Sequence, residues 1–504
     1  MVMKFVTAFF LLMAAVLPKA FSQHPDDKST AKRLIEKSME AMGKGWQSVK
    51  SISFDGYGYQ GLIDQSERQE GPYIPVQIQR SILKDLPNGA FLVNQATQSY
   101  NFKDTSTLLF NGEAIAVKSG QGFAPARNGQ ELRDELNLSP ELILSKALAS
   151  PDLKYIKDTV FQKAKHSIIF FKSNGYPVRF FLNKETDLLS AVEITKPFND
   201  DFSNIWGDVK KTIIYSFWML LGNGVHYPLQ WDTYLNDWYK ESFLISSWKI
   251  NPVIDAASLQ ITAKVKEDGK QLAGNENEAF KKKIEEGGKE IAPGVWFLAG
   301  ICNSTIINQP DGIVVIESPL SSRYGELIIA KVNKLFPGKK IKALVSTSNA
   351  WLHIGGVRAF AAIPGIKIYH PARNRQILEK LLNAPFTTEP DILAKTLRPT
   401  YTLTGVTDTL AIGSGDTRLV MYAYQTETGD RQMMVYFPQY KLVYTSDLYQ
   451  GSNTKDKYWN PHIVWEVYHS IMTRKINVQQ FYSTHSRGLI PFKDLEKDVE
   501  AGMQ

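Results

Sequence analysis

The pattern of apolar residues changes near the middle of the chain, and this change limits the folds that the sequence can adopt. Before about residue 262, short runs rich in β-branched and aromatic residues follow one another, separated by turn residues such as Asn174-Gly175. After about residue 291, strand-like and helix-like runs alternate. Successive strands predict an antiparallel sheet, whereas helices distributed among strands predict helical layers over sheets. The sequence therefore predicts two domains of different architecture.

The first predicted domain, residues 23–262, is antiparallel and β-rich and begins with a helix. Ser29 or Thr30 can cap this helix, and Gly43 ends it. Strands are predicted over residues 51–54, 167–171, 178–182, 189–194, 212–217 and 243–250. Aromatic residues are dense here, which is typical of a sheet core and rim. A groove for an apolar or lipid-like ligand is the alternative interpretation.

Residues 263–290 are polar, charged and glycine-containing, which predicts a linker with a short helix over 277–284. The second domain, residues 291–504, follows it. Its predicted strands cover 295–298, 304–307, 312–316, 342–345, 366–369, 417–424, 432–437, 442–445 and 478–482, and its predicted helices cover 323–335, 355–361, 373–382, 463–472 and the segment from 492. Helices around two groups of strands predict a four-layer αββα sandwich, which makes the whole chain α+β.

The first 22 residues have the features of an export signal. Lys4 precedes an apolar run from Phe5 to Leu17, and Ala20-Phe21-Ser22 ends in small residues. The run of 13 residues is shorter than the about 20 that cross a bilayer. We therefore expect a periplasmic or secreted protein with no integral membrane segment after signal removal.

Composition excludes several classes of function. The net charge of +7 is mild for 504 residues, and the basic residues are scattered, so we expect no nucleic-acid partner. Cys302 is the single cysteine, which excludes an internal disulfide and a zinc finger, and its apolar surroundings predict a small buried residue. Eight histidines leave histidine and carboxylate chemistry open.

One segment carries a family resemblance. Residues 344–356 read Leu-Val-Ser-Thr-Ser-Asn-Ala-Trp-Leu-His-Ile-Gly-Gly, which is a buried strand, a loop and the turn Gly355-Gly356. With the strands at 294–300 and 312–317, it resembles the metallo-β-lactamase fold superfamily, over about residues 291–500. In that family the loop reads Thr-His-x-His-x-Asp-His-x-Gly-Gly and its side chains converge on one or two zinc ions. The resemblance implies that Asp447 is the later aspartate of the site and His485 its final histidine.

The ligand loop departs from the family pattern. Aligned on Thr347 and the glycines, Ser348 and Ala350 replace two histidines, Leu352 replaces the aspartate, and only His353 remains. The other histidine would fall near Thr428, and no histidine lies between His370 and His462. Serine, alanine and threonine are not zinc ligands here, so we expect no dinuclear centre. We expect either no cofactor or one zinc held by His353, Asp447 and His485.

Three functional hypotheses follow. In the first, the protein is a non-classical or inactive member that binds a small molecule, with catalysis impaired because leucine cannot position or deprotonate water. In the second, it is a mononuclear metal-dependent hydrolase of an ester, lactone or amide. In the third, the first domain carries a lipid or hydrophobic ligand, because its strands and the segment 204–208 resemble a lipoprotein-carrier-type β domain. The sequence contains no nucleophile elbow, no phosphate-binding loop and no G-x-G-x-x-G at a strand–helix junction.

Overall fold

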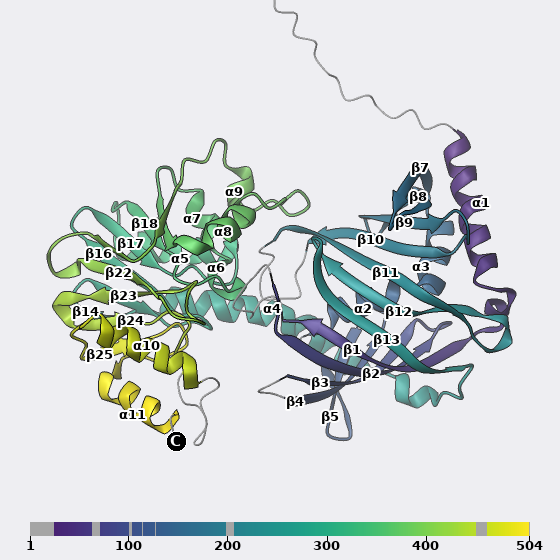
Figure 1. The fold of residues 1–504 in the computed structure, drawn as a ribbon, viewed down its shortest axis with the longest axis horizontal. Helices are drawn as coiled ribbons and strands as arrows, with labels where there is room; N and C mark the ends of the chain where they lie inside the picture. The colour runs from purple at the N-terminus through teal and green to yellow at the C-terminus, as the bar shows by residue number, and fades with distance from the viewer. Residues whose placement is uncertain are drawn as a thin grey trace, which may run out of the picture.

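A single antiparallel sheet of 13 strands forms the first half of the chain in the computed structural model (Figure 1). The structure describes residues 25–62, 71–99, 103–112, 114–126, 128–197, 206–449 and 461–502, so the predicted export signal lies outside the described residues. The strands are β1 (Ser51–Gly61), β2 (Pro75–Asp85), β3 (Ala90–Gln98), β4 (Lys103–Asn111), β5 (Ala114–Ser119), β6 (Gly122–Pro125), β7 (Lys154–Phe161), β8 (Ala164–Ser173), β9 (Tyr176–Asn183), β10 (Leu189–Pro197), β11 (Asp208–Leu220), β12 (His226–Leu235) and β13 (Trp238–Ile250). Strand β1 pairs with β13 and so joins two meanders, β6 to β1 and β13 to β7.

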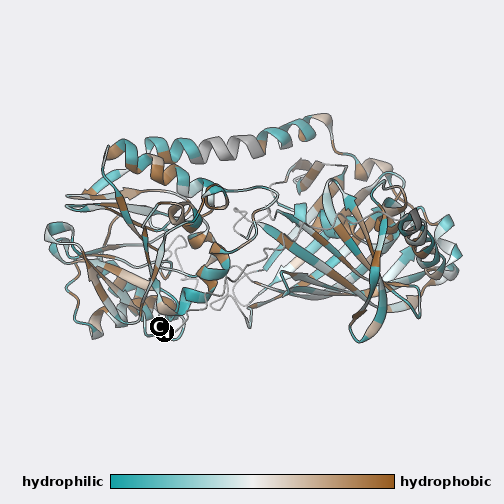
Figure 2. Ribbon diagram, turned by 90° about the horizontal axis from the view of Figure 1, so that it is seen from above, coloured by the Kyte–Doolittle hydropathy of each residue, from teal (hydrophilic) through white to brown (hydrophobic). Residues whose placement is uncertain are grey.

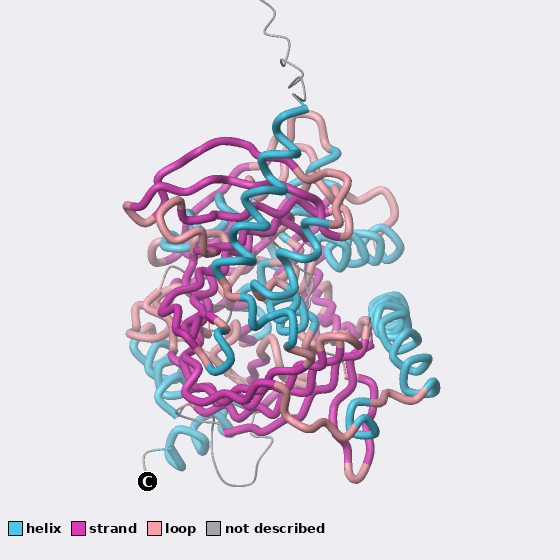
Figure 3. The backbone as a smooth tube through the Cα atoms, turned by 90° about the vertical axis from the view of Figure 1, so that its right-hand side faces the viewer, coloured by secondary structure: helices cyan, strands magenta, loops and turns pink. Residues whose placement is uncertain are grey.

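Alternating burial along these strands places one face of the sheet against helices. In β2, Val76, Ile78, Arg80 and Ile82 are buried, and residues 77, 79 and 81 between them are exposed. Helices α1 (Pro25–Ala41), α2 (Gln130–Asn137) and α3 (Pro140–Leu148) share one hydrophobic core with the sheet. Figure 3 shows the strands curving around these helices. The core is therefore filled by helices and aromatic side chains, as the core-and-rim interpretation predicts.

The first helix begins earlier than predicted. It runs from Pro25, so Ser29 and Thr30 lie inside it rather than capping it. Serine and threonine cap a helix only from the position just before its first turn, and here the helical backbone already includes both residues.

Buried lysine–glutamate ion pairs join the sheet to the helices α2 and α3. Lys84 Nζ lies 2.7 Å from Glu141 Oε1, and both side chains are almost fully buried. Lys211 Nζ lies 3.3 Å from Glu131 Oε1 and 3.2 Å from Glu135 Oε1. Two carboxylates thus share one buried ammonium group. Burial and the neighbouring acidic groups raise the pKa of Glu135 to about 7 although Lys211 opposes this, whereas Lys211 and other lysines outweigh burial and lower the pKa of Glu131 to about 2.

The segment predicted as a linker forms one long helix, α4 (Ala263–Glu286), rather than a short helix at 277–284. The side chain of Thr262 caps it by accepting from the N–H of Val265 at 3.3 Å. Lysine, glutamate, glutamine and alanine are strong helix formers, and they outweigh the glycines in the segment. Helix α4 contacts β5 and β6 in one domain and α5 in the other, and Figure 2 shows it running along both.

The second half forms the predicted αββα sandwich. One sheet of seven strands comprises β14 (Lys289–Ala292), β15 (Val295–Leu298), β16 (Ser304–Gln309), β17 (Gly312–Ile316), β18 (Ile341–Val345), β19 (Lys367–Pro371) and β20 (Thr402–Val406). The other, of six strands, comprises β21 (Thr409–Ile412), β22 (Leu419–Ala423), β23 (Met433–Phe437), β24 (Leu442–Tyr444), β25 (Gln480–Tyr482) and β26 (Ile490–Pro491). Buried residues of both sheets pack together between them.

Helices cover the outer face of each sheet. Against the first pack α5 (Ser322–Leu335), α6 (Trp351–Ile354), α7 (Val357–Ala361), α8 (Arg375–Leu382) and α9 (Ile392–Lys395), and against the second pack α10 (Pro461–Thr473) and α11 (Phe492–Gly502). Strands β17 and β18 are parallel, as are β24 and β25. The loops after these four strands consequently lie at one edge of the sandwich. No helix among the described residues is long and apolar enough to cross a membrane.

Candidate functional site

Polar side chains from separate loops meet at this edge. Glu317 directly follows β17, and the loop after β18 leads through Ser348 into α6, which carries His353. Asp447 follows β24, and His485 follows β25. The structure therefore brings together the three residues that the sequence singled out as metal ligands.

Asp447 lies between the two imidazoles. His353 Nε2 is 3.2 Å from Asp447 Oδ2, and His485 Nε2 is 3.0 Å from Asp447 Oδ1. His353 is buried, whereas the side chain of His485 is 24% exposed. Solvent therefore reaches the group from the side of His485.

Other contacts hold the second nitrogen of each imidazole. His485 Nδ1 is 3.2 Å from the carbonyl oxygen of Ile301. His353 Nδ1 is 3.4 Å from Thr484 Oγ1 and 3.9 Å from Glu317 Oε2. An N–H at each Nδ1 would leave Nε2 available to bind a cation that the Asp447 carboxylate also binds, and this is the tautomer that metal-binding histidines adopt.

Glu317 holds the loop after β18 through hydrogen bonds to Thr347. Its Oε1 accepts hydrogen bonds from the N–H of Thr347, at 2.7 Å, and from the Thr347 hydroxyl. Its Oε2 is buried without a hydrogen-bond partner. Glu317 and Ser446 both have φ of 62°, in the left-handed region that non-glycine residues rarely adopt. Backbone strain of this kind gathers at functional sites.

Cys302 is a member of the site that the sequence did not reveal. Its Sγ, one ring nitrogen of His353 and one of His485 all lie within 4.8 Å of one another. The thiol is fully buried, as expected. Its apolar sequence context concealed its neighbours, because nothing local shows that residues 302 and 485 meet.

The electrostatics of the site follow from these contacts. Burial acts to raise the pKa of Asp447, but the two histidines outweigh it and hold that pKa well below its usual range. Burial acts to lower the pKa of His353, yet Asp447 and Glu317 raise it above its ordinary value. Burial, with the charges of Asp447 and Glu317, raises the pKa of the Cys302 thiol. Without a cation, Cys302 is therefore a neutral thiol and not an activated nucleophile.

The four positions at which the family pattern would place further ligands are occupied in other ways. Ser348 Oγ accepts from the N–H of Ala350 at 3.2 Å. Leu352 packs against the hydrophobic core beneath the helices. Thr428 donates its N–H, at 3.0 Å, and its hydroxyl to the buried carboxylate of Glu466 in α10. These side chains supply no second set of metal ligands.

The turn Gly355-Gly356 is required by close packing. A Cβ atom on Gly355 would lie 2.2 Å from the carbonyl oxygen of Leu320. One on Gly356 would lie 2.2 Å from the side-chain oxygen of Ser318, whose carbonyl accepts the Gly356 N–H at 2.8 Å. The glycines thus allow the site helix to lie directly on the loop that follows β17.

The first domain contacts the site helix. Trp206 and Trp238 lie with their ring centroids 5.2 and 5.7 Å from that of Trp351. Asp208 accepts hydrogen bonds from the N–H groups of Thr387, at 3.0 Å, and Thr388, at 3.1 Å. Trp206 belongs to the same hydrophobic core as the helices of the second domain. The two domains are therefore joined by a buried interface beside the site.

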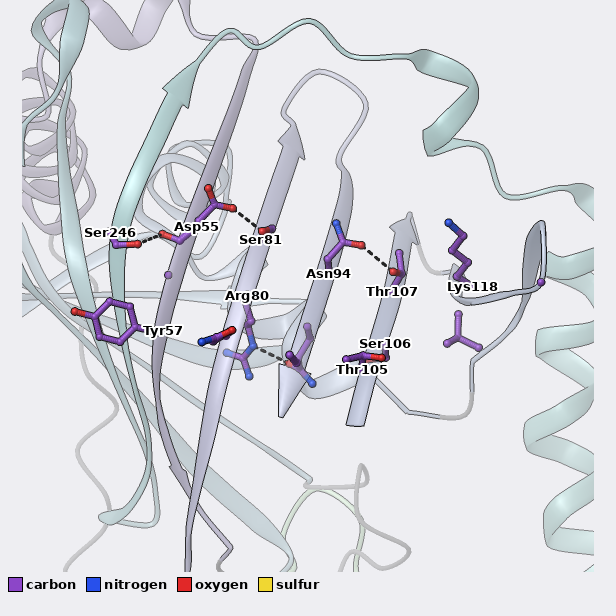
Figure 4. A pocket seen from close by; sticks show the side chains of 16 residues that line it. Asp55, Tyr57, Arg80, Ser81, Asn94, Thr105, Ser106, Thr107, Lys118 and Ser246 are labelled. Atoms are coloured by element: carbon purple, nitrogen blue, oxygen red, sulfur yellow. Dashed lines mark hydrogen bonds between the residues drawn. The ribbon is translucent and has the colours of Figure 1, made fainter. Parts of the chain in front are cut away.

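The first domain contains several cavities, of which two bear on ligand binding. An open groove of about 790 Å³ follows the sheet, where Ser81 donates to Asp55 and Thr107 donates to Asn94 at 2.7 Å (Figure 4). Such cross-strand pairs are typical of the solvent face of a sheet. A smaller cavity of about 460 Å³ lies between α1 and α3. Its apolar lining comprises Met39, Met42, Trp46, Val49, Leu86, Leu142 and Leu144.

Two facing sheets with helices outside them, and a polar site built by strand-end loops at one edge, are what the sequence resemblance implies. The C-terminal domain thus has the layers and the strand-end site that the resemblance to the metallo-β-lactamase fold implies. No protein-family model and no curated protein matches the chain. The layer order and the strand-end loops define this fold.

Solved structures similar to the chain include an inverting sec-alkylsulfatase from a Pseudomonas species, a metallo-β-lactamase from Pseudomonas aeruginosa in its mono-zinc form, and rubredoxin oxygen:oxidoreductase from Desulfovibrio gigas. Their sequence identities are 16%, 15% and 12%, and their TM-scores 0.33, 0.33 and 0.34. Each match covers 43% of this chain and, respectively, 41%, 94% and 62% of the other protein. The chain thus spans less than half of the sulfatase.

The donor set fits one metal ion and not two. Zinc takes sulfur, imidazole and carboxylate ligands, usually four of them in a tetrahedron. Asp447 contacts both His353 and His485, and Cys302 Sγ lies within 4.8 Å of a ring nitrogen of each histidine. Ser348, Ala350 and Thr428 offer no second competent set.

Proposed function

We propose that this chain is a binding protein built on the metallo-β-lactamase fold, and that its pocket holds one zinc-type cation. The observation that carries the proposal is the convergence of His353 Nε2 and His485 Nε2 on the carboxylate of Asp447, at 3.2 and 3.0 Å. Their Nδ1 atoms are meanwhile held by other groups. Both features are typical of a metal site whose ligands are oriented by outer contacts.

The residues around the site support binding rather than hydrolysis. A bound zinc ion acts as a Lewis acid and lowers the pKa of a coordinated water. A hydrolase also needs a group that positions that water or accepts its proton. Leu352 stands where the family pattern has this carboxylate, and it packs into the core. We therefore expect weak or no hydrolytic activity.

Metal analysis tests the proposal. Full-length protein purified without chelator is compared with a His353→Ala, His485→Ala double variant and with a His462→Ala, His469→Ala control. The control removes two histidines that stack on Trp465 in α10. We expect about one zinc per chain in the wild type and the control and none in the double variant. Zinc at about 100 times its Kd should stabilise the folded protein by about 2.7 kcal/mol. If the protein is purified without metal and its Tm does not rise when zinc is added, the proposal is wrong.

A mononuclear hydrolase is the second candidate, favoured by the 24% exposure of the His485 side chain. An ester, lactone or amide could approach the site from that side. Zinc-loaded wild type and the double variant are assayed against all three substrate classes. Turnover that needs zinc and is lost in the double variant would replace the binding proposal with this one.

A hydrophobic ligand in the first domain is the third candidate, favoured by the apolar cavity between α1 and α3. Lipid extraction from the purified full chain, followed by mass spectrometry, tests it. Met39→Glu places a charge in the cavity lining, so it should remove a bound lipid. The absence of any co-purifying lipid would reject this candidate.

We also propose that the protein acts outside the cytoplasm, on the basis of the export features of residues 1–22. Cell fractionation and N-terminal sequencing test this. We expect the mature chain to begin at Gln23. Retention of the first 22 residues on cytoplasmic protein would contradict export.

A further inference from the structure

The loop that carries Cys302 is fixed to the loop that carries His485. Asn303 donates its N–H to the carbonyl oxygen of Thr484 at 2.7 Å. Its side-chain amide donates to the carbonyl oxygens of Ser483, at 3.0 Å, and Ser486, at 2.7 Å. His485 Nδ1 in turn lies 3.2 Å from the carbonyl oxygen of Ile301. The residues on both sides of Cys302 therefore hold it in register with His485.

The space on the other side of this loop is also closed. A Cβ atom on Gly300 would lie 2.5 Å from the carbonyl oxygen of Cys302 and 2.6 Å from Tyr324 Oη. Cys302 is fully buried, and its Sγ lies within 4.8 Å of a ring nitrogen of both His353 and His485. The thiol therefore lies beside the two imidazoles, and the carboxylate of Asp447 contacts both of these imidazoles.

A second observation independently indicates a cation. Glu317 Oε2 is fully buried without a hydrogen-bond partner, and it lies 3.9 Å from Nδ1 of His353. A buried carboxylate behind an imidazole is the outer contact that raises the basicity of a metal-binding histidine. A positive ion at Nε2 would also offset the negative charge that Glu317 and Asp447 place in this interior.

We propose that the thiolate of Cys302 is the fourth ligand of the cation and closes the site with His353, His485 and Asp447. This inference rests on the proposed function. Binding forms a metal–sulfur bond and breaks the S–H bond, and the proton leaves to solvent. A zinc-type ion with four protein ligands has no open position for water or substrate. The metal is thus held as a structural ion.

Cobalt(II) added to metal-free, full-length protein tests this. A thiolate bound to cobalt gives a near-ultraviolet charge-transfer band, and imidazole and carboxylate ligands do not. We expect the band in the wild type and its absence in Cys302→Ser and Cys302→Ala. Zinc affinity of both variants should fall by more than the about 10- to 100-fold that loss of an outer contact costs. Proton release on zinc binding, measured by calorimetry in two buffers, should also decrease.

Each result is decisive. Cobalt bound through the histidines, with visible bands but no thiolate band, would overturn the fourth-ligand role and leave the proposed function intact. No cobalt binding at all would overturn both. Cys302 is the single cysteine of the chain, so a thiolate band in the wild type supports the inference even if neither variant folds.

Discussion

The indole of Trp206 packs edge-on against that of Trp351, with ring centroids 5.2 Å apart and an interplanar angle of 68°. Trp206 directly precedes the turn into β11 of the first domain, whereas Trp351 begins the helix that carries His353. Trp238 completes the group, 5.3 Å from Trp206. Edge-on aromatic pairs are favoured by their ring quadrupoles. The β-rich domain therefore supports the site helix.

Trp206→Ala should destabilise this interface by about 3–5 kcal/mol, the usual cost of truncating a buried tryptophan. It should also weaken zinc binding, because the helix carrying His353 loses its support. Calorimetric unfolding and zinc titration measure the two effects. Trp465→Ala, which truncates a 37% exposed side chain on α10, is the control and should change neither. Unchanged zinc affinity in Trp206→Ala would show that the interface does not position the site.

Gly355→Ala should lower Tm by the equivalent of about 1–3 kcal/mol, the usual cost of overpacking. Its new methyl group would meet the backbone carbonyl of Leu320 at 2.2 Å, and backbone cannot move aside cheaply. Gly122→Ala is the matched control, because a Cβ there meets nothing within 4 Å. Thermal unfolding measures the Tm of both variants, and we expect a lower Tm only in Gly355→Ala. Equal Tm values for the two would contradict the close packing of the turn.

The contributions of Glu131 and Glu135, which share Lys211, to folding stability should depend on pH in opposite directions. The pKa of Glu135 is raised to about 7, so its favourable contribution is present below its ordinary pKa and is lost as pH rises to about 7. The pKa of Glu131 is lowered to about 2, so its contribution is present above its ordinary pKa and is lost as pH falls to about 2.

The wild type should therefore lose stability on the order of 3 kcal/mol between pH 4.5 and 7 through Glu135, and Glu135→Gln should not show this loss. Glu131→Gln should instead flatten the stability profile below pH 4.5. Denaturant unfolding across this pH range measures both. Parallel profiles for the two variants would contradict the unequal sharing of Lys211.

Much of the architecture could be predicted because burial periodicity is local. The alternating strands of the first half and the αββα layers of the second follow from it, as do the strand ends that carry Asp447 and His485. The full length of helix α4 was not predicted, because its apolar face is narrow and its glycines suggest a break. Its two ends pack on different domains, which no local pattern reveals.

Cys302 and Glu317 were not identified as site residues from the sequence. Each follows a strand in an apolar run, and each acquires its role only through a partner distant in sequence. Glu317 could have been suspected, because a carboxylate that ends a buried strand beside the ligand loop needs a partner. Cys302 had no such indication.

Glu317→Gln should lower zinc affinity by about 10- to 100-fold, the usual cost of losing an outer contact to a metal ligand. Glutamine keeps the oxygen that accepts from Thr347, so the loop should stay in place and the metal-free Tm should change little. Loss of the negative charge at Oε2 should then make the imidazole of His353, whose Nδ1 is 3.9 Å away, a weaker metal ligand. Competition titration with a chromogenic chelator measures the affinity.

Glu466→Gln is the matched control for this prediction. Glu466 is also buried and accepts from the N–H and hydroxyl of a threonine, Thr428. It has no contact with the imidazoles of His353 or His485 among the contacts of the described residues, so its substitution should lower Tm and leave zinc affinity unchanged. Equal losses of affinity in the two variants would mean that Glu317 acts through stability alone. A loss of zinc affinity in Glu317→Gln alone would show that Glu317 is a positioning residue for His353.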